Sequence, residues 1–180
     1  MNLFKIFIPI FFIFNITVAL AQEASVLFEN NGFRGVNLGE KVKNYSFIHP
    51  YNKSLVSPNK GIAKRRTDIA TWYNSHMIDP KNPNFQKLGD AKILGVFVGT
   101  THEKISQIEI ITEYNYRVYQ SLLETYGKPY IDCCDEEDKD TRSAWKVNNI
   151  DLILASDNYS SLDTKGTYYT IIFVDRNLKK

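Results

Sequence analysis

The chain contains only two cysteines among its 180 residues, and these two, Cys133 and Cys134, are adjacent. Neighbouring Cα atoms lie about 3.8 Å apart across a trans peptide bond, short of the roughly 4.4–6.8 Å usual for a disulfide. Two interpretations stay open at this point: a pair of reduced or externally paired thiols, and a strained, easily reduced vicinal disulfide. In either case the fold does not depend on a framework of disulfide bonds.

Histidine is also scarce, because only His49, His76 and His102 are present and they are far apart in the sequence. A polyhistidine metal site would need all of them to converge. The segment from His102 begins like a zinc protease motif, but Ser106 stands where the second histidine must be. We therefore expect no metal site.

Several local signatures of enzymes are absent as well. The chain has no Gly-x-Ser-x-Gly, no Gly-x-Gly-x-x-Gly and no Walker-type sequence. These motifs mark many hydrolases, dinucleotide-binding enzymes and phosphate-binding loops. Their absence leaves no sequence reason to expect a cofactor, although a catalytic site assembled from distant residues stays open.

The sequence carries no strong excess of charge of either sign. Its 22 lysines and arginines balance 20 aspartates and glutamates, which gives a formal net charge of +2. Loss of an N-terminal leader would take away Lys5 and no acid, which lowers this value to about +1. A chain so close to neutral has no general electrostatic attraction to nucleic acid or to anionic membranes. We therefore expect no nucleic-acid partner.

Residues 1–21 have the order of a secretory signal peptide. One cation, Lys5, precedes an apolar run of about fifteen residues, Ile6–Leu20. Ala21, with Ala19 two positions before it, ends the segment in the small-x-small pattern of a cleavage site. Because a membrane-spanning helix needs about twenty apolar residues, a cleaved leader is favoured over a retained anchor.

We predict cleavage between Ala21 and Gln22, which leaves residues 22–180 as a single globular domain of ordinary size. No cysteine lies near this position, so the lipid anchor of a bacterial lipoprotein has no point of attachment. The expected product is exported to the periplasm or the extracellular medium and has no stable membrane anchor. The oligomeric state stays open.

Runs of apolar, β-branched and aromatic residues between turn signals predict strands. They are Asp68–His76, Ala91–Val98, Lys104–Thr112, Ser143–Asn148, Ile150–Ser156 and Thr167–Asp175. Short connections favour two antiparallel hairpins, one through Gly99–Glu103 and one near Asn148–Asn149. A short helical turn is expected near Glu40–Tyr45, and a loop is expected at Asp79–Asn84.

Apolar residues recur three and four positions apart between Tyr114 and Tyr126, which predicts an amphipathic helix. Gly127 suits its C-terminal cap, and Pro129 prevents its continuation. The predicted fold class is therefore α+β. It combines a mainly antiparallel sheet with one principal helix, at about residues 114–126, packed on one face.

An acidic segment carries both cysteines, and its composition indicates a loop. Its acidic residues are Asp132, Asp135, Glu136, Glu137, Asp138 and Asp140. Such a dense negative field disfavours the thiolate, which argues against a catalytic cysteine at position 133 or 134. The segment also lacks the alternating order of acids in a calcium loop. A solvated run of charge and a docking surface for a partner remain as alternatives.

A basic cluster forms the counterpart of this acidic segment. Its members are Lys60, Lys64, Arg65 and Arg66. No aromatic residues alternate with these cations, as they would on a surface that stacks nucleic-acid bases. The cluster is interpreted either as a source of solubility or as one pole of an interaction surface.

From Lys92 onward the chain resembles a loose class of small exported bacterial proteins. In this class a hydrophobic hairpin leads into a helix ending Tyr-Gly-Lys-Pro, and a strand bearing tryptophan follows. The matching residues are Ile105, Ile108 and Ile110, then Tyr126-Gly127-Lys128-Pro129, then Trp145. Phe33–Gly39 looks like the opening of these proteins.

The element that joins the helix to Gly-Lys-Pro is also similar to the fold of an outer-membrane assembly lipoprotein, although this chain lacks the lipoprotein cysteine. The resemblance implies structural roles only. Gly127 and Pro129 would end a helix, Trp145 would fill a core, and no catalytic residue is carried over.

These observations favour a non-enzymatic binding or interaction module in the envelope of a Gram-negative bacterium. Its expected partner is a protein or another envelope component. Two alternatives belong to other classes: a hydrolase whose site is assembled from distant residues, and an inhibitor or immunity protein that uses the acidic segment at residues 132–140.

Overall fold

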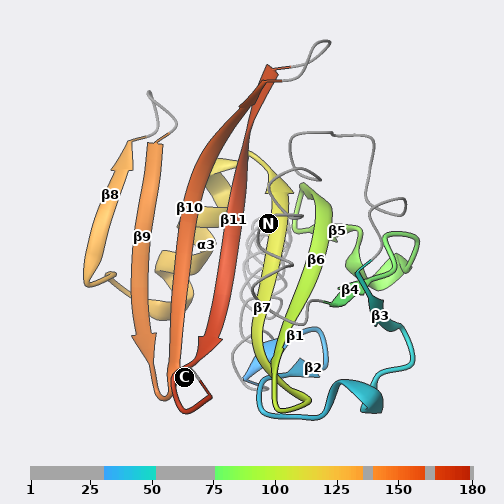
Figure 1. Ribbon diagram of the computed structural model, residues 1–180. Helices are drawn as coiled ribbons and strands as arrows, with labels where there is room; N and C mark the ends of the chain where they lie inside the picture. Colours follow the sequence, from blue (N-terminus) through green and yellow to red (C-terminus); the bar gives the residue numbers. More distant parts are fainter. Residues whose placement is uncertain (1–30, 52–75, 136–139, 161–164, 179–180) are drawn as a thin grey trace, which may run out of the picture.

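The structure, a computed structural model, describes residues 31–51, 76–135, 140–160 and 165–178 (Figure 1). Several predictions fall outside these residues and stay predictions. They concern the leader with Ala21 and Gln22, the strand Asp68–His76 up to residue 75, the basic cluster at 60–66, and the acids Glu136, Glu137 and Asp138.

Most of the described chain forms one antiparallel sheet of nine strands. Eight of them lie in the order β3, β4, β6, β7, β11, β10, β9, β8, while β5 pairs with β6. Their bounds are β3 Ile48–Pro50, β4 His76–Ile78, β5 Lys87–Leu88, β6 Ala91–Thr101, β7 Lys104–Glu113, β8 Ile131–Asp135, β9 Asp140–Val147, β10 Ile150–Ser160 and β11 Lys165–Asp175. A separate ribbon pairs β1, Gly32–Phe33, with β2, Val36–Asn37.

Both expected hairpins are confirmed, and their strands extend beyond the predicted bounds. Strand β6 pairs with β7 through a turn at His102 and Glu103, which have φ angles of 51° and 63°. Strand β9 pairs with β10 through a turn that contains Asn148, at φ 49°. Asparagine tolerates this left-handed conformation better than most residues do. The last expected strand is confirmed as β11, which pairs with β10 and β7.

One α-helix, α3, spans Tyr116–Tyr126 in the described part of the chain. It begins two residues later than predicted, because Asn115 caps it by accepting a hydrogen bond from the Arg117 N–H at 3.0 Å. Gly127 ends it with a φ of 71° and donates its N–H to the Leu123 carbonyl at 2.8 Å. The mainly antiparallel sheet with a single principal helix is therefore confirmed.

Two short 3-10 helices complete the described elements. The helical turn expected near Glu40–Tyr45 is confirmed as η1, Val42–Asn44. The expected loop at Asp79–Asn84 runs into η2, Pro83–Phe85, whose first turn is capped by the Asn82 side chain.

Among the residues that the structure describes, the buried apolar ones gather in two clusters. Ile110 belongs to the larger one and Ile111 to the smaller one. Because successive residues of a strand point to opposite sides of its sheet, the clusters lie on opposite sides. The three buried residues of α3, namely Val118, Tyr119 and Leu122, belong to the larger cluster.

The C-terminal end of α3 is tied to β9 by Trp145. The indole Nε1–H of Trp145 donates to the Gly127 carbonyl at 2.8 Å, and its ring centroid lies 6.4 Å from that of Tyr126. Burial raises the pKa of Tyr126 to about 12, so this phenol stays neutral at ordinary pH. Trp145 is buried, as the sequence resemblance implied.

The expectation of a loop around the two cysteines is wrong for residues 131–135. These residues form β8, which pairs with β9 from Ile131 opposite Ala144 to Asp135 opposite Asp140. Aspartate is depleted in strands, so composition favoured a loop, but the ladder with β9 overrides this weak preference. Cys133 and Asp132 therefore lie on a strand at the end of the sheet.

Trp145→Phe tests the tie between helix and sheet. The substitution keeps an aromatic ring in the core but removes the indole donor of the Gly127 carbonyl and leaves part of the volume of the larger buried ring unfilled. We expect the free energy of unfolding to fall by about 1–3 kcal/mol, measured by urea denaturation followed by circular dichroism. An unchanged denaturation midpoint and slope would contradict this role.

Candidate edge-strand interface

Strand β8 is the last strand in the order of the sheet and pairs with β9 (Figure 1). In an antiparallel ladder, alternate residues turn their N–H and C=O groups toward the neighbouring strand, while the others point away from it. An edge strand therefore offers backbone donors and acceptors to another extended chain. Protein edges of this kind either recruit a partner strand or are protected against one.

The chain enters β8 with two adjacent exposed residues, Tyr130 and Ile131. Their exposed fractions are 55% and 50%, and they are the exposed large hydrophobic residues of the described part of the chain. The Tyr130 N–H donates to the Ala144 carbonyl at 2.9 Å, and the Lys146 ammonium lies 4.8 Å from the Tyr130 ring centroid. Scattered exposed apolar residues are common, and this pair stands out because both members lie where the chain enters an edge strand.

Asp132 follows this pair and has an unusually well-defined carboxylate for an exposed residue. Its Oδ1 accepts hydrogen bonds from the hydroxyls of Tyr119 and Ser143, each at 3.0 Å. Both donors are buried, with exposed fractions of 5% and 1%. Because Tyr119 belongs to α3 and Ser143 to β9, two elements of the fold orient one carboxylate at the edge.

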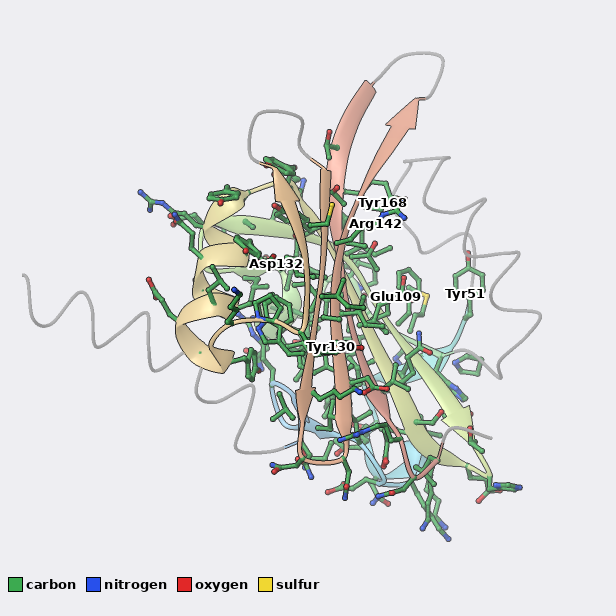
Figure 2. The ribbon with its side chains drawn as sticks, turned by 90° about the vertical axis from the view of Figure 1, so that its left-hand side faces the viewer. Tyr51, Glu109, Tyr130, Asp132, Arg142 and Tyr168 are labelled. Atoms are coloured by element: carbon green, nitrogen blue, oxygen red, sulfur yellow. The ribbon has the colours of Figure 1, made fainter. Side chains whose placement is uncertain are left out.

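Cys133 and Arg142 occupy the opposite side of the sheet. They lie directly opposite each other on β8 and β9, and both are exposed. Figure 2 shows Asp132 on the side where α3 lies and Arg142 on the other side. Cys133 is a free thiol, so no disulfide joins it to its neighbour in this structure.

Two further acids of the segment lie at the far end of the same hairpin. Asp135 ends β8 and is directly opposite Asp140, the first residue of β9. Of the six acids singled out in the sequence, the structure therefore places Asp132, Asp135 and Asp140 along one edge hairpin.

The other side of the sheet holds a buried carboxyl group that sequence analysis did not single out. Glu109 on β7 is 5% exposed and lies opposite Phe97 on one neighbouring strand and Ile172 on the other. Figure 2 places Glu109, with Tyr168 and Tyr51, on the side of the sheet away from Asp132. Its position among apolar neighbours makes it part of the interior and not of the edge.

The three histidines lie away from β8. His49 and His76 belong to the neighbouring strands β3 and β4, and His102 lies in the turn between β6 and β7. Within residues 31–51, 76–135, 140–160 and 165–178, no group of three or more His, Cys, Asp or Glu side chains is arranged to hold a metal ion.

A second oriented carboxylate, Glu40, lies near the β1–β2 ribbon. Tyr45 donates its hydroxyl to Oε2 at 2.8 Å, and the Asn37 amide donates to Oε1 at 3.1 Å. Mainly through the Tyr45 bond, and then the Asn37 bond, the pKa of Glu40 lies below its ordinary value of 4.5. Because Tyr45 also accepts from the Asn37 backbone N–H, this group closes a local turn and is structural.

Sequence analysis missed Tyr130, Ile131 and the hydroxyl donors of Asp132. In the sequence, Tyr119 lies within the predicted helix and Ser143 begins a predicted strand. No local signal indicated that their hydroxyl groups meet one carboxylate, since the three residues are brought together by the packing of α3, β8 and β9.

Comparison with protein-family models, with curated protein sequences and with solved structures finds no match. The expected resemblance to small exported bacterial proteins therefore stays an expectation. In the part of the chain that the structure describes, no helix is both long and apolar enough to cross a membrane.

Tyr45→Phe tests the group around Glu40. With its strongest donor removed, the pKa of Glu40 is expected to rise toward 4.5, as followed through its carboxyl carbon by NMR titration. A carboxyl group whose pKa is lower in the folded than in the unfolded state stabilises the fold at pH values above its unfolded-state pKa. This stabilisation is lost as the pH falls through its folded-state pKa. The acid-induced loss of stability below about pH 4.5 should therefore become shallower in the variant. An unchanged pKa of Glu40 would contradict this.

Proposed function

We propose that this protein is an exported, non-enzymatic binding module that accepts an extended segment of another protein along β8. The observation that carries the proposal is the edge strand itself, which begins with the adjacent exposed residues Tyr130 and Ile131. Strand addition of this kind combines backbone hydrogen bonds, which give affinity, with alternate side-chain contacts, which give specificity.

The site of action follows from the leader. Residues 1–21 have the composition of a signal peptide, and cleavage before Gln22 would release the domain into the periplasm or the medium. The partner is then a protein of the envelope or its surroundings. The net charge of +2 on this chain gives no general attraction to nucleic acid, which agrees with a protein partner.

A rigid edge strand would bind a partner with little loss of conformational entropy. We infer that α3 covers the face of the sheet that carries the larger apolar cluster, since Val118, Tyr119 and Leu122 all belong to that cluster. The helix then supports β8 from behind through the hydrogen bond of Tyr119 to Asp132. A preorganised surface loses less conformational entropy on binding than a mobile one.

An inhibitor that presents the same hairpin to a basic enzyme site is the second candidate. The observation that favours it is the pair of acids at the end of the hairpin, Asp135 opposite Asp140. This mode depends on charge at the end of the hairpin and not on strand pairing along β8. Substitutions at the two ends of β8 therefore distinguish this inhibitor mode from strand addition.

Ile131→Lys tests strand addition. Its side chain is half exposed, so the fold should tolerate the change, while apolar contact with a paired segment is lost. We expect capture of extended peptides from an immobilised peptide array to weaken about tenfold, equivalent to about 1.4 kcal/mol. Ile131→Val is the matched control and should bind like the natural protein. Equal binding by both variants would contradict docking at the start of β8.

A further inference from the structure

The edge of β8 differs in chemistry on its two sides. Because strand side chains alternate, Ile131 and Cys133 point to one side and Asp132 to the other. The first side continues across β9 to Arg142, which is exposed and lies opposite Cys133. The side chains of a segment that pairs with β8 also alternate between the two sides of the sheet. Its odd residues therefore face one side of β8 and its even residues face the other.

We propose that the partner of β8 is an extended segment in which apolar residues alternate with lysine or arginine, and that Asp132 receives one of these cations. This inference rests on the proposed strand addition and specifies its partner. The apolar residues lie on the side of Ile131, and the cations lie on the side of Asp132.

The geometry of Asp132 carries the assignment of a cation. Its Oδ1 is held by Tyr119 and Ser143, and its Oδ2 makes no hydrogen bond within the described part of the chain. An ionised carboxylate can accept several hydrogen bonds, so Oδ2 retains its capacity at an exposed edge. A charge-assisted bond from lysine or arginine is about twice as strong as a neutral one.

The charge of the hairpin favours the same partner. Residues 132–140 contain six acids in the sequence, which attract a basic partner in preference to an acidic one. A second copy of this chain is disfavoured, because two such edges bring their acids together. On the other side, the exposed Arg142 disfavours a cation of the partner next to Cys133.

The test uses residues 22–180 and three fluorescein-labelled peptides of nine residues. One alternates valine and lysine, one alternates valine and glutamate, and one contains the first composition in blocks of valine and lysine. Fluorescence anisotropy at physiological salt gives the affinities. We expect the alternating valine–lysine peptide to bind at least tenfold more tightly than either of the others.

Asp132→Asn removes the negative charge but keeps the shape of the side chain. It is expected to weaken binding of the valine–lysine peptide about tenfold, and Tyr119→Phe is expected to weaken it less. Glu103→Gln is the matched control, because it removes one exposed acid from the β6–β7 turn. Strands β7 and β8 are separated by three others, about 19 Å at ordinary strand spacing.

The location of the peptide is measured with the thiol of Cys133, which is free and exposed. In a Cys134→Ser background, bound peptide should slow the reaction of Cys133 with a maleimide. Circular dichroism verifies that each variant is folded. This readout reports occupancy of β8 independently of the charge of the peptide.

The outcomes separate the two levels of the proposal. If all three peptides protect Cys133 equally and Asp132→Asn has no effect, strand addition holds and the basic alternating partner is wrong. If none of the peptides binds or protects Cys133, both the partner and the proposed function are contradicted. Sedimentation that shows a dimer with Cys133 protected in the absence of peptide would replace the proposed partner with a second copy of the chain.

Discussion

The alternation of side chains along each strand is the constraint on which the rest of this structure depends. It separates Ile110 from Ile111 into two apolar clusters, on opposite sides of the sheet. The same alternation separates Asp132 from Cys133 at the edge, so one side of β8 carries the carboxylate of Asp132 and the other carries a thiol opposite Arg142. A segment that paired with β8 would meet this division, and the proposed alternating partner follows from it.

The end of α3 determines how the chain reaches this edge. Gly127 stops the helix with a positive φ of 71° and accepts the hydrogen bond of Trp145 at its carbonyl. Tyr130 then bonds to the backbone of Ala144, and β8 begins at the next residue. Helix termination, core packing and the edge strand thus meet within a short stretch of chain, which Trp145 contacts at Tyr126 and Gly127.

Long periodic segments were predictable, because their patterns reflect one dominant interaction. The β6–β7 and β9–β10 hairpins and helix α3 follow from apolar spacing and turn residues such as Gly127. Strand β8 was not predictable in the same way. Its Asp and Cys residues suit a loop, and only the ladder with β9, formed across the chain, makes them a strand.

The candidate site was visible in the sequence only as a group of six acids around two cysteines. Nothing in the local pattern distinguished Asp132 from the others. Its distinction comes from the hydroxyls of Tyr119 and Ser143, which approach it from different elements. Tyr130 and Ile131 were equally hidden, because apolar residues next to a strand are normally expected to be buried.

NMR of the isotope-labelled domain with the alternating valine–lysine peptide tests the central claim most directly. The account predicts intermolecular contacts between the backbone of the peptide and that of β8, with the largest amide shifts at Ile131, Asp132 and Cys133. Shifts centred on β3, at the opposite end of the sheet order, or contacts confined to side chains at the end of the hairpin would contradict it.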